Sequence, residues 1–105
     1  MPLARAVQGA RHTAQRISWR DKDGDPQDLT GATINGRIEN RKTNTAVAID
    51  GTLLADGDPE DGVFVWSYGA NDVATAGVFD VQFIATYGPL NDKTLVETWT
   101  VERAI

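Results

Sequence analysis

The sequence predicts an all-β protein folded as one antiparallel sandwich, and three features of the chain indicate it. Short segments in which polar and apolar side chains alternate recur along the chain, as in strands with one face in a core. Turns rich in Gly, Asp and Pro separate these segments. No helical pattern of ten or more residues occurs between them.

The first predicted strand begins near Thr13 and places Ile17 and Trp19 on one face. A hairpin-type turn follows over residues 21–26. Asp and Gly favour tight turns, and Pro26 has no N–H to donate to a strand ladder. We therefore expect the strand to end before this turn.

The second predicted strand, residues 32–40, has the clearest alternation in the chain. Its inward side carries Ala32, Ile34, Gly36 and Ile38, and this period of two is typical of a strand with one wet face. Gly36 in the middle of the strand predicts a bulge, or a place where a large neighbouring side chain such as a Trp needs room.

The third predicted strand covers residues 45–50 and has Val47 and Ile49 inward. Residues 52–54 continue it after a break at Gly51. An acidic loop follows, and the next strand is rich in aromatic and β-branched residues. This strand covers residues 63–68, with Phe64, Trp66 and Tyr68 on one face.

The last third of the chain predicts a short helical or 3₁₀ turn and two further strands. The turn covers residues 71–76, and the strand after it, residues 78–87, has a core face of Phe79, Val81, Phe83 and Ala85. A turn at 88–92 leads to a closing strand over 94–102, with Trp99 and Val101 inward.

Together these segments predict an immunoglobulin-like antiparallel β-sandwich of six to eight strands. A chain of 105 residues has the usual size of one domain and supports one core. We assign the sandwich to residues 13–105. Residues 1–12 have weak periodicity, and we expect a flexible or weakly ordered basic arm there.

Charge is unevenly distributed between the start of the chain and the rest. Residues 1–20 contain Arg5, Arg11, Arg16 and Arg20 and no acidic residue, whereas all 15 acidic residues follow. A basic segment on an acidic body is suited to protein–protein contacts, so these four arginines are the candidate interaction residues. The same charge distribution disfavours nucleic-acid binding, because four scattered arginines would release few counterions and the acidic body would repel phosphate.

The sequence disfavours enzymatic chemistry. His12 is the only histidine and lies in the leading segment, and the only serines are Ser18 and Ser67, so no Ser-His-Asp triad is expected. The abundant carboxylates fall in turns or on polar strand faces, whereas glycoside hydrolysis needs a buried acid in a cleft. We expect no catalytic residue and no cofactor. No stretch approaches the roughly 18 apolar residues of a membrane helix.

A calcium site stays open as an alternative. Asp21, Asp23 and Asp25 have the 1, 3, 5 spacing of an EF-hand loop, but Pro26 and Ala32 stand where that loop needs Gly and Glu. The loop therefore fails as an EF-hand. A looser oxygen-rich site is conceivable in the second acidic loop, on Asp56, Asp58, Glu60 and Asp61.

The three tryptophans raise a carbohydrate-binding or host-adhesion module as the alternative function. Sugar-binding sandwiches stack sugar rings on exposed aromatic side chains. Trp19, Trp66 and Trp99 all fall on the apolar side of their predicted strands, which favours a core role for each.

The order of turn and strand motifs resembles one family. Residues 21–34 read DKDGDPQDLTGATI, an Asp-x-Asp-Gly-like turn followed by Leu-Thr-Gly-Ala-Thr opening a strand. Residues 61–66 (DGVFVW) and 76–83 (AGVFDVQF) supply two Gly-led strands, and residues 93–101 close the pattern. This plan, over about residues 13–103, is similar to the N-terminal immunoglobulin-like domain of phage baseplate upper proteins and to related phage tail and fibre modules.

The resemblance implies a non-catalytic structural module of the virion, made in the cytoplasm of the bacterial host. Its expected partners are other tail, baseplate or head proteins, often in symmetric rings or trimers, and it leaves homo-oligomerisation open. Members usually continue into a receptor-binding or fibre region, so the chain is either a virion subunit by itself or one domain of a longer protein.

Overall fold

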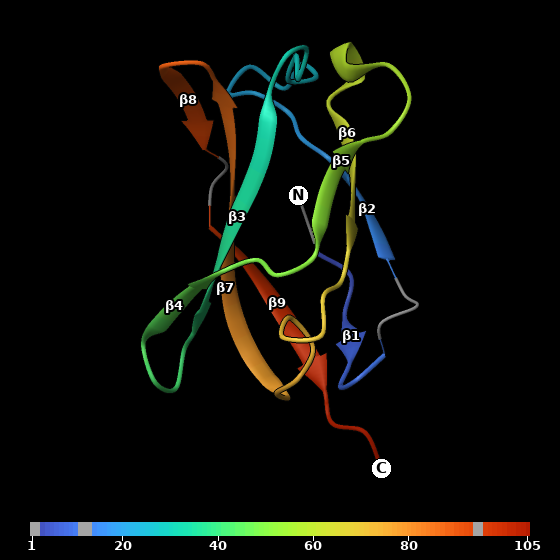
Figure 1. Ribbon diagram of the computed structural model, residues 1–105, viewed down its shortest axis with the longest axis vertical. Helices are drawn as coiled ribbons and strands as arrows, with labels where there is room; N and C mark the ends of the chain where they lie inside the picture. Colours follow the sequence, from blue (N-terminus) through green and yellow to red (C-terminus); the bar gives the residue numbers. More distant parts are fainter. Residues whose placement is uncertain (1–2, 11–13, 94–95) are drawn as a thin grey trace.

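The computed structural model describes residues 3–10, 14–93 and 96–105. Over these residues the chain forms nine strands and one 3₁₀ turn (Figure 1). In chain order they are β1 (Ala6–Val7), β2 (Ala14–Ser18), β3 (Thr33–Asn40), β4 (Thr45–Ala48), β5 (Thr52–Ala55), η1 (Pro59–Asp61), β6 (Val63–Ser67), β7 (Gly77–Tyr87), β8 (Leu90–Lys93) and β9 (Glu97–Glu102).

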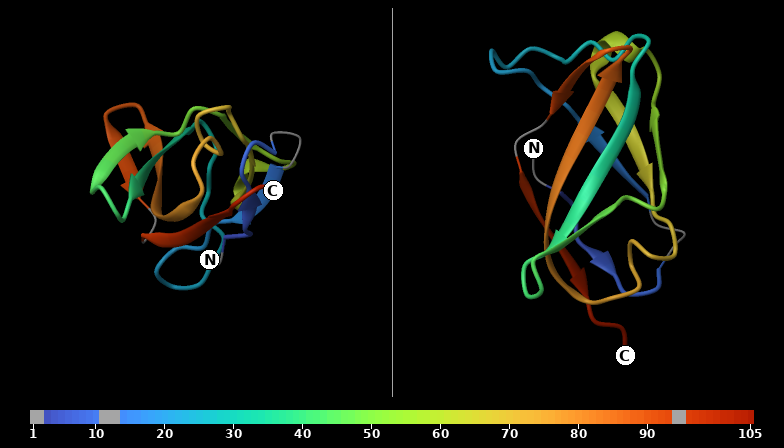
Figure 2. Two further views of the ribbon diagram at one scale, coloured as in Figure 1. Left: turned by 90° about the horizontal axis from the view of Figure 1, so that it is seen from below. Right: turned by 60° about the vertical axis from the view of Figure 1, so that its left-hand side comes forward.

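The strands form two sheets that face each other. The larger sheet has the order β1-β9-β7-β3-β4, with β8 also paired to β7, and the smaller has the order β2-β6-β5. Every pairing is antiparallel except that of β1 with β9. The views in Figure 2 show the two layers with the chain crossing between them after β4. The predicted fold class, an all-β sandwich of the immunoglobulin-like kind, is confirmed.

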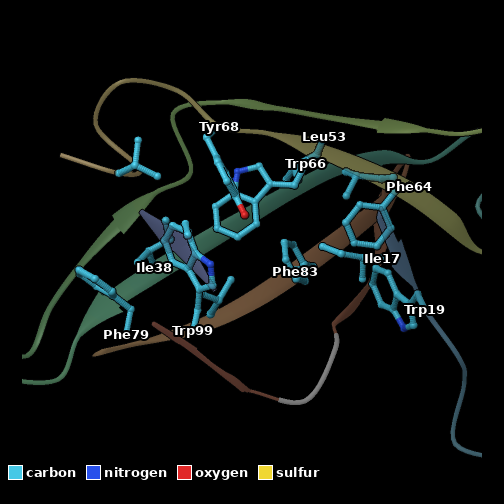
Figure 3. Packing of buried hydrophobic residues seen from close by; sticks show 14 of the residues in the cluster. Ile17, Trp19, Ile38, Leu53, Phe64, Trp66, Tyr68, Phe79, Phe83 and Trp99 are labelled. Carbon is cyan, nitrogen blue, oxygen red and sulfur yellow. The ribbon is translucent and has the colours of Figure 1, made fainter. Parts of the chain in front are cut away.

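Aromatic side chains from both sheets fill the space between them (Figure 3). Trp66 and Trp99 are fully buried with ring centroids 4.5 Å apart, and Phe64 and Phe83 meet edge to face at 5.1 Å. Trp19, 4% exposed, packs on the edge of Phe64. Such pairs add about 0.5–1.5 kcal/mol each beyond the apolar area that they bury. The predicted core role of all three tryptophans is confirmed.

The predicted inward faces agree with the observed burial along most strands. Exposed and buried residues alternate along β2, β3 and β7, and the predicted core residues of β6 and β7 are buried. The large neighbour predicted to need room at Gly36 is Ile49: a Cβ on Gly36 would overlap the Ile49 Cδ1 atom. The pairing of β3 with β7 runs through Gly36 without a bulge.

Residues 3–10 differ from the predicted weakly ordered arm, since they belong to the sandwich. β1 extends the larger sheet beyond β9, and the Ala6 side chain is 2% exposed. The Ala4 C=O accepts a hydrogen bond from Trp99 Nε1 at 3.1 Å, and the Ala4 N–H donates to Gln15 Oε1 at 2.9 Å. A strand of two small residues has too short a pattern to be recognised, so the arm prediction is wrong for this part of the chain.

Three turn regions differ in detail from the prediction. The turn after β7 is short, so Leu90–Lys93 becomes strand β8, and the closing strand starts at Glu97; residues 94–95 lie outside the described residues. Residues 70–75 form irregular turns and bends rather than a helical turn. The 3₁₀ turn is η1, which Asp58 caps by accepting from the Glu60 N–H.

Candidate interaction site: the edge of β4 and the groove beside it

Strand β4 is the outermost strand of the larger sheet, and among the described residues it pairs with β3 alone. All four of its residues, Thr45–Ala48, are exposed. The Ile49 N–H donates to the Gly36 C=O on β3. Because amide direction alternates along a strand, Ala46 and Ala48 direct their N–H and C=O groups away from β3.

The chemistry of β4 does little to block pairing with another strand. Natural edge strands are usually protected by charged side chains, Pro or bulges. Thr45–Ala48 contains no charge and no Pro, and its register with β3 is continuous. Among the described residues Arg37 protects this edge, since its Nη2 donates to the Ala46 C=O, but at a long 3.5 Å. The edge is therefore available for strand pairing.

Val47, on β4, was predicted to lie in the core, and the structure differs from this prediction. It faces the same side of the sheet as its partner Ile38, as expected, but 53% of it is exposed. In Figure 2 the β3–β4 hairpin lies at the margin of the larger sheet, away from the smaller sheet, and Val47 lines an open groove there. Its prediction as a core residue is wrong for this reason.

A groove of about 320 Å³ lies over this uncovered part of the sheet. Its apolar lining comes from Ile38, Val47 and Phe79 on three adjacent strands. Polar side chains supply the rest: Asn40, Thr43, Thr45, Asn71, Asp72 and Thr75. An apolar floor with a hydroxyl and amide rim beside an open strand edge is the arrangement by which strand addition gains both affinity and specificity.

Asp72 fixes the wall of the groove formed by the loop after β6. Its carboxylate is 6% exposed and accepts four hydrogen bonds. Three come from backbone N–H groups, Asp50 at 2.8 Å, Gly51 at 2.9 Å and Gly69 at 2.8 Å, and one from Trp66 Nε1 at 3.3 Å. A buried charge with this many donors is stable where an unpaired one would not be.

Two of the donors of Asp72, Asp50 and Gly51, belong to the segment where the chain crosses from β4 in one sheet to β5 in the other, and the other two, Trp66 and Gly69, lie in β6 and just after it. The crossing is close: a Cβ on Gly51 would overlap the Ser67 C=O, and one on Gly69 would overlap the Asp50 carboxylate. Asp50 adds a bond of its own, accepting from the Asn71 N–H at 3.2 Å. Asp72 therefore ties the end of β4 to the loop that borders the groove.

The four predicted interaction arginines do not form one cluster. Arg5 pairs with Glu102 at 2.6 Å and Arg16 with Asp56 at 2.7 Å, while Arg20 donates to the Gly24 C=O; Arg11 lies outside the described residues. The Arg5 and Arg16 side chains are 75% and 67% exposed, so their ion pairs stabilise the fold by less than about 1 kcal/mol. Both remain open to exchange with an acidic partner.

The acidic loops use their carboxylates to close turns. Asp21 Oδ1 accepts from the N–H groups of Asp23 and Asp25, as Asp58 does from Glu60. Asp28 accepts from Thr30, and this bonding lowers the pKa of Asp28. Within the described residues no three acidic or histidine side chains are close enough together to hold a metal ion. The calcium alternative gains no geometric support there.

The candidates for catalysis and sugar stacking are likewise not brought together. Ser18 and Ser67 lie at opposite ends of the smaller sheet, since Ser67 pairs with Ala14 at the other end of β2, and His12 lies outside the described residues. The tryptophan rings are enclosed in the core and offer no stacking surface. The part of the chain that the structure covers has no helix that is long and apolar enough to cross a membrane.

No family model matches this chain, and no curated protein matches it.

Asp72, the groove and the open edge of β4 were not predicted from the sequence. Asp72 stands in a stretch that has no strand alternation, Asn71–Asp72–Val73, and nothing in its neighbours indicates burial. The uncharged run of residues 45–49 was the available signal for the edge, because a half-exposed strand normally carries charged side chains on its wet face.

Proposed function

We propose that the chain is a non-enzymatic structural component of a phage virion, a tail, baseplate or fibre module that mediates protein–protein assembly. The observation that carries the proposal is the open, uncharged β4 edge beside the groove. Edge strands with free N–H and C=O groups accept strands of other chains, and alternate side chains of the added strand enter a neighbouring pocket.

The distribution of charge supports an assembly role. The turn at 21–25 and the loop around η1 lie at the same end of the molecule in Figure 1, and Leu29, in the segment that follows the turn, donates its N–H to the Pro59 C=O. Both segments are acidic. A surface with one strongly acidic end orients approaching basic partners and raises their association rate. This effect is larger at low salt.

The resemblance to baseplate and fibre domains supplies the virion setting, since the open edge by itself indicates only a strand-accepting module. The assignment to tail, baseplate or fibre, and the localisation in the virion, therefore rest on the motifs at residues 21–34, 61–66 and 76–83.

The proposal is tested on purified phage particles made in cells that carry the encoding phage genome. Quantitative mass spectrometry is expected to find the chain in a copy number that fits the symmetry of the tail or baseplate. The Val47→Glu variant, which places a charge at the groove, is expected to be incorporated at least tenfold less. Val78→Glu is the matched control, because Val78 is also half-exposed (41%) and lies away from the groove. Absence of the wild-type chain from the particles would contradict the proposal.

A further inference from the structure

We propose that the β4 edge pairs with the β4 edge of a second copy, antiparallel and about a two-fold axis at Val47, so that the larger sheets of two molecules become continuous. This deepens the proposed assembly function by naming the partner as another copy of the chain. It rests on the direction of the free peptide groups, on the side chains along the edge and on the charges at its two ends.

The free peptide groups select the register. Ala46 and Ala48 carry the outward N–H and C=O groups, so they must form the hydrogen-bonded pairs of the new ladder. Antiparallel pairing then puts Ala46 opposite Ala48 of the second copy, Ala48 opposite its Ala46, and Val47 opposite Val47. Thr45 comes opposite Ile49 of the second copy.

The side chains allow this pairing. Ala46 and Ala48 share one face and are small, and the Arg37 side chain on that face must release its long 3.5 Å bond to the Ala46 C=O when two edges pair. The two Val47 side chains share the groove face, where each is now half-exposed. Cross-strand contact between β-branched residues stabilises such pairs by about 0.2–1 kcal/mol. The pair of valines would cover the mouths of both grooves from the side left open by the smaller sheet.

The charges at the ends of β4 are complementary in this arrangement. Arg41 and Lys42 lie in the turn before β4, and Asp50 follows it. Arg41 is already held by Asp80 at 2.7 Å, whereas Lys42 is an exposed residue at the tip of the hairpin. The two-fold axis brings this tip to the end of the ladder where Asp50 of the second copy lies. Lys42 and Asp50 of the two copies therefore come to the same ends of the ladder, where Asp50 also accepts from the Asn71 N–H, and the residues of β4 itself carry no charge.

The position of β4 in the molecule leaves room for the second copy. In both views of Figure 2 the β3–β4 hairpin lies at the margin of the fold, away from the smaller sheet. One short ladder buries less than the roughly 1,200 Å² of a standard interface, so we expect a weak dimer with a Kd on the order of 10⁻⁴ M.

Charge variants at the two-fold axis test the register in solution. Sedimentation equilibrium of the full chain at 10 µM to 1 mM is expected to show a monomer–dimer equilibrium for the wild type. Val47→Lys and Val47→Glu each place like charges side by side and are expected to weaken the dimer at least tenfold. Mixing the two variants in equal amounts is expected to restore it. Circular dichroism of each variant verifies the fold.

Single cysteines give a second measurement that does not depend on affinity, because the chain contains no Cys of its own. Non-hydrogen-bonded residues opposite each other have Cα atoms about 4.5 Å apart, within the 4.4–6.8 Å range of disulfides. Val47→Cys is therefore expected to form a covalent dimer under mild oxidation. Ala46→Cys is the matched control, since its counterpart lies about 8 Å away across the axis.

Two results would overturn the proposal. One is a wild-type chain that stays monomeric up to 1 mM. The other is a dimer in which Val47→Cys cross-links no faster than Ala46→Cys, or in which the mixture of Val47→Lys and Val47→Glu stays monomeric. A monomer that is nevertheless found in purified particles would overturn self-pairing alone and leave the virion role in place.

Discussion

Replacing Asp72 by Ala tests whether this buried carboxylate holds the crossing between the two sheets. The substitution leaves four N–H groups without their acceptor: those of Asp50, Gly51 and Gly69 and the Trp66 indole. A hydrogen bond to a charged group stabilises a fold by about 1.5–3 kcal/mol, and a buried donor left without a partner costs about 1–3 kcal/mol. Because the groove can admit water to some of these donors, we expect a loss of about 4 kcal/mol rather than the full sum.

Urea unfolding followed by tryptophan fluorescence measures this loss. With an m value of about 2 kcal/mol/M, the midpoint of unfolding is expected to fall by about 2 M. Asp72→Asn keeps one oxygen for the three donors bound to Oδ2 but turns an NH₂ group toward the Asp50 N–H, so we expect about half of the loss. Asp50→Ala is the control, since within the described part of the chain this exposed carboxylate accepts one bond, from Asn71, and its loss should cost less than about 1 kcal/mol.

An Asp72→Ala variant within about 1 kcal/mol of the wild type would show that this carboxylate does not hold the crossing. An Asp50→Ala variant as unstable as Asp72→Ala would show the same, because the loss would then not depend on the number and burial of the bonds.

Three further predictions concern other parts of the core. Ala6→Asp puts a charge in a position that is 2% exposed and is expected to cost at least about 3 kcal/mol in urea unfolding, whereas Val7→Asp, on the 48% exposed neighbour, should cost under about 1; equal losses would restore the arm interpretation. Gly36→Ala is expected to destabilise by about 1 kcal/mol, because its methyl group forces the end of the Ile49 side chain to turn aside, and a double-mutant cycle with Ile49→Val, which lacks the overlapping atom, should show a favourable coupling. Burial raises the pKa of Tyr68 above its ordinary 10.0, so the folded state keeps a proton that the unfolded chain releases, and stability is expected to fall as pH rises above 10. Urea titrations at pH 8 to 11.5 should show a smaller fall in Tyr68→Phe, and an unchanged slope would argue against this assignment.

The sandwich could be predicted because its strands obey one rule at every position. In β7, each second residue from Phe79 to Ala85 is buried, and the alternation alone specifies the inward face. Alternation of polar and apolar residues cannot predict burial where an element is only two or three residues long, or where burial depends on another layer. Ala6–Val7 is two residues long, and its burial depends on pairing with β9, which lies more than 90 positions later in the chain.

Prediction of the site failed for a related reason. Val47 has the correct orientation for a core residue, but whether it is covered depends on how far the smaller sheet extends. Asp72 is buried because donors from residues 50, 51, 66 and 69 converge on it, and that convergence follows from the crossing of two loops. Alternation within one strand contains no information on either. The four arginines were proposed from charge alone, and the structure places three of them on separate contacts.

The open edge and the buried carboxylate have one geometric origin. β4 and β5 belong to different sheets, yet only residues 49–51 separate them, so the chain must leave the larger sheet abruptly at Asp50 and Gly51. Backbone groups freed at such a departure lose their strand partners and need others, which Asp72 supplies. The same departure draws the chain away from β4 toward the smaller sheet. The edge of β4 therefore keeps its outward N–H and C=O groups. A longer crossing segment could fold back over β4 and close this edge, and in that form neither the groove nor the pairing of two copies at Val47 would be available.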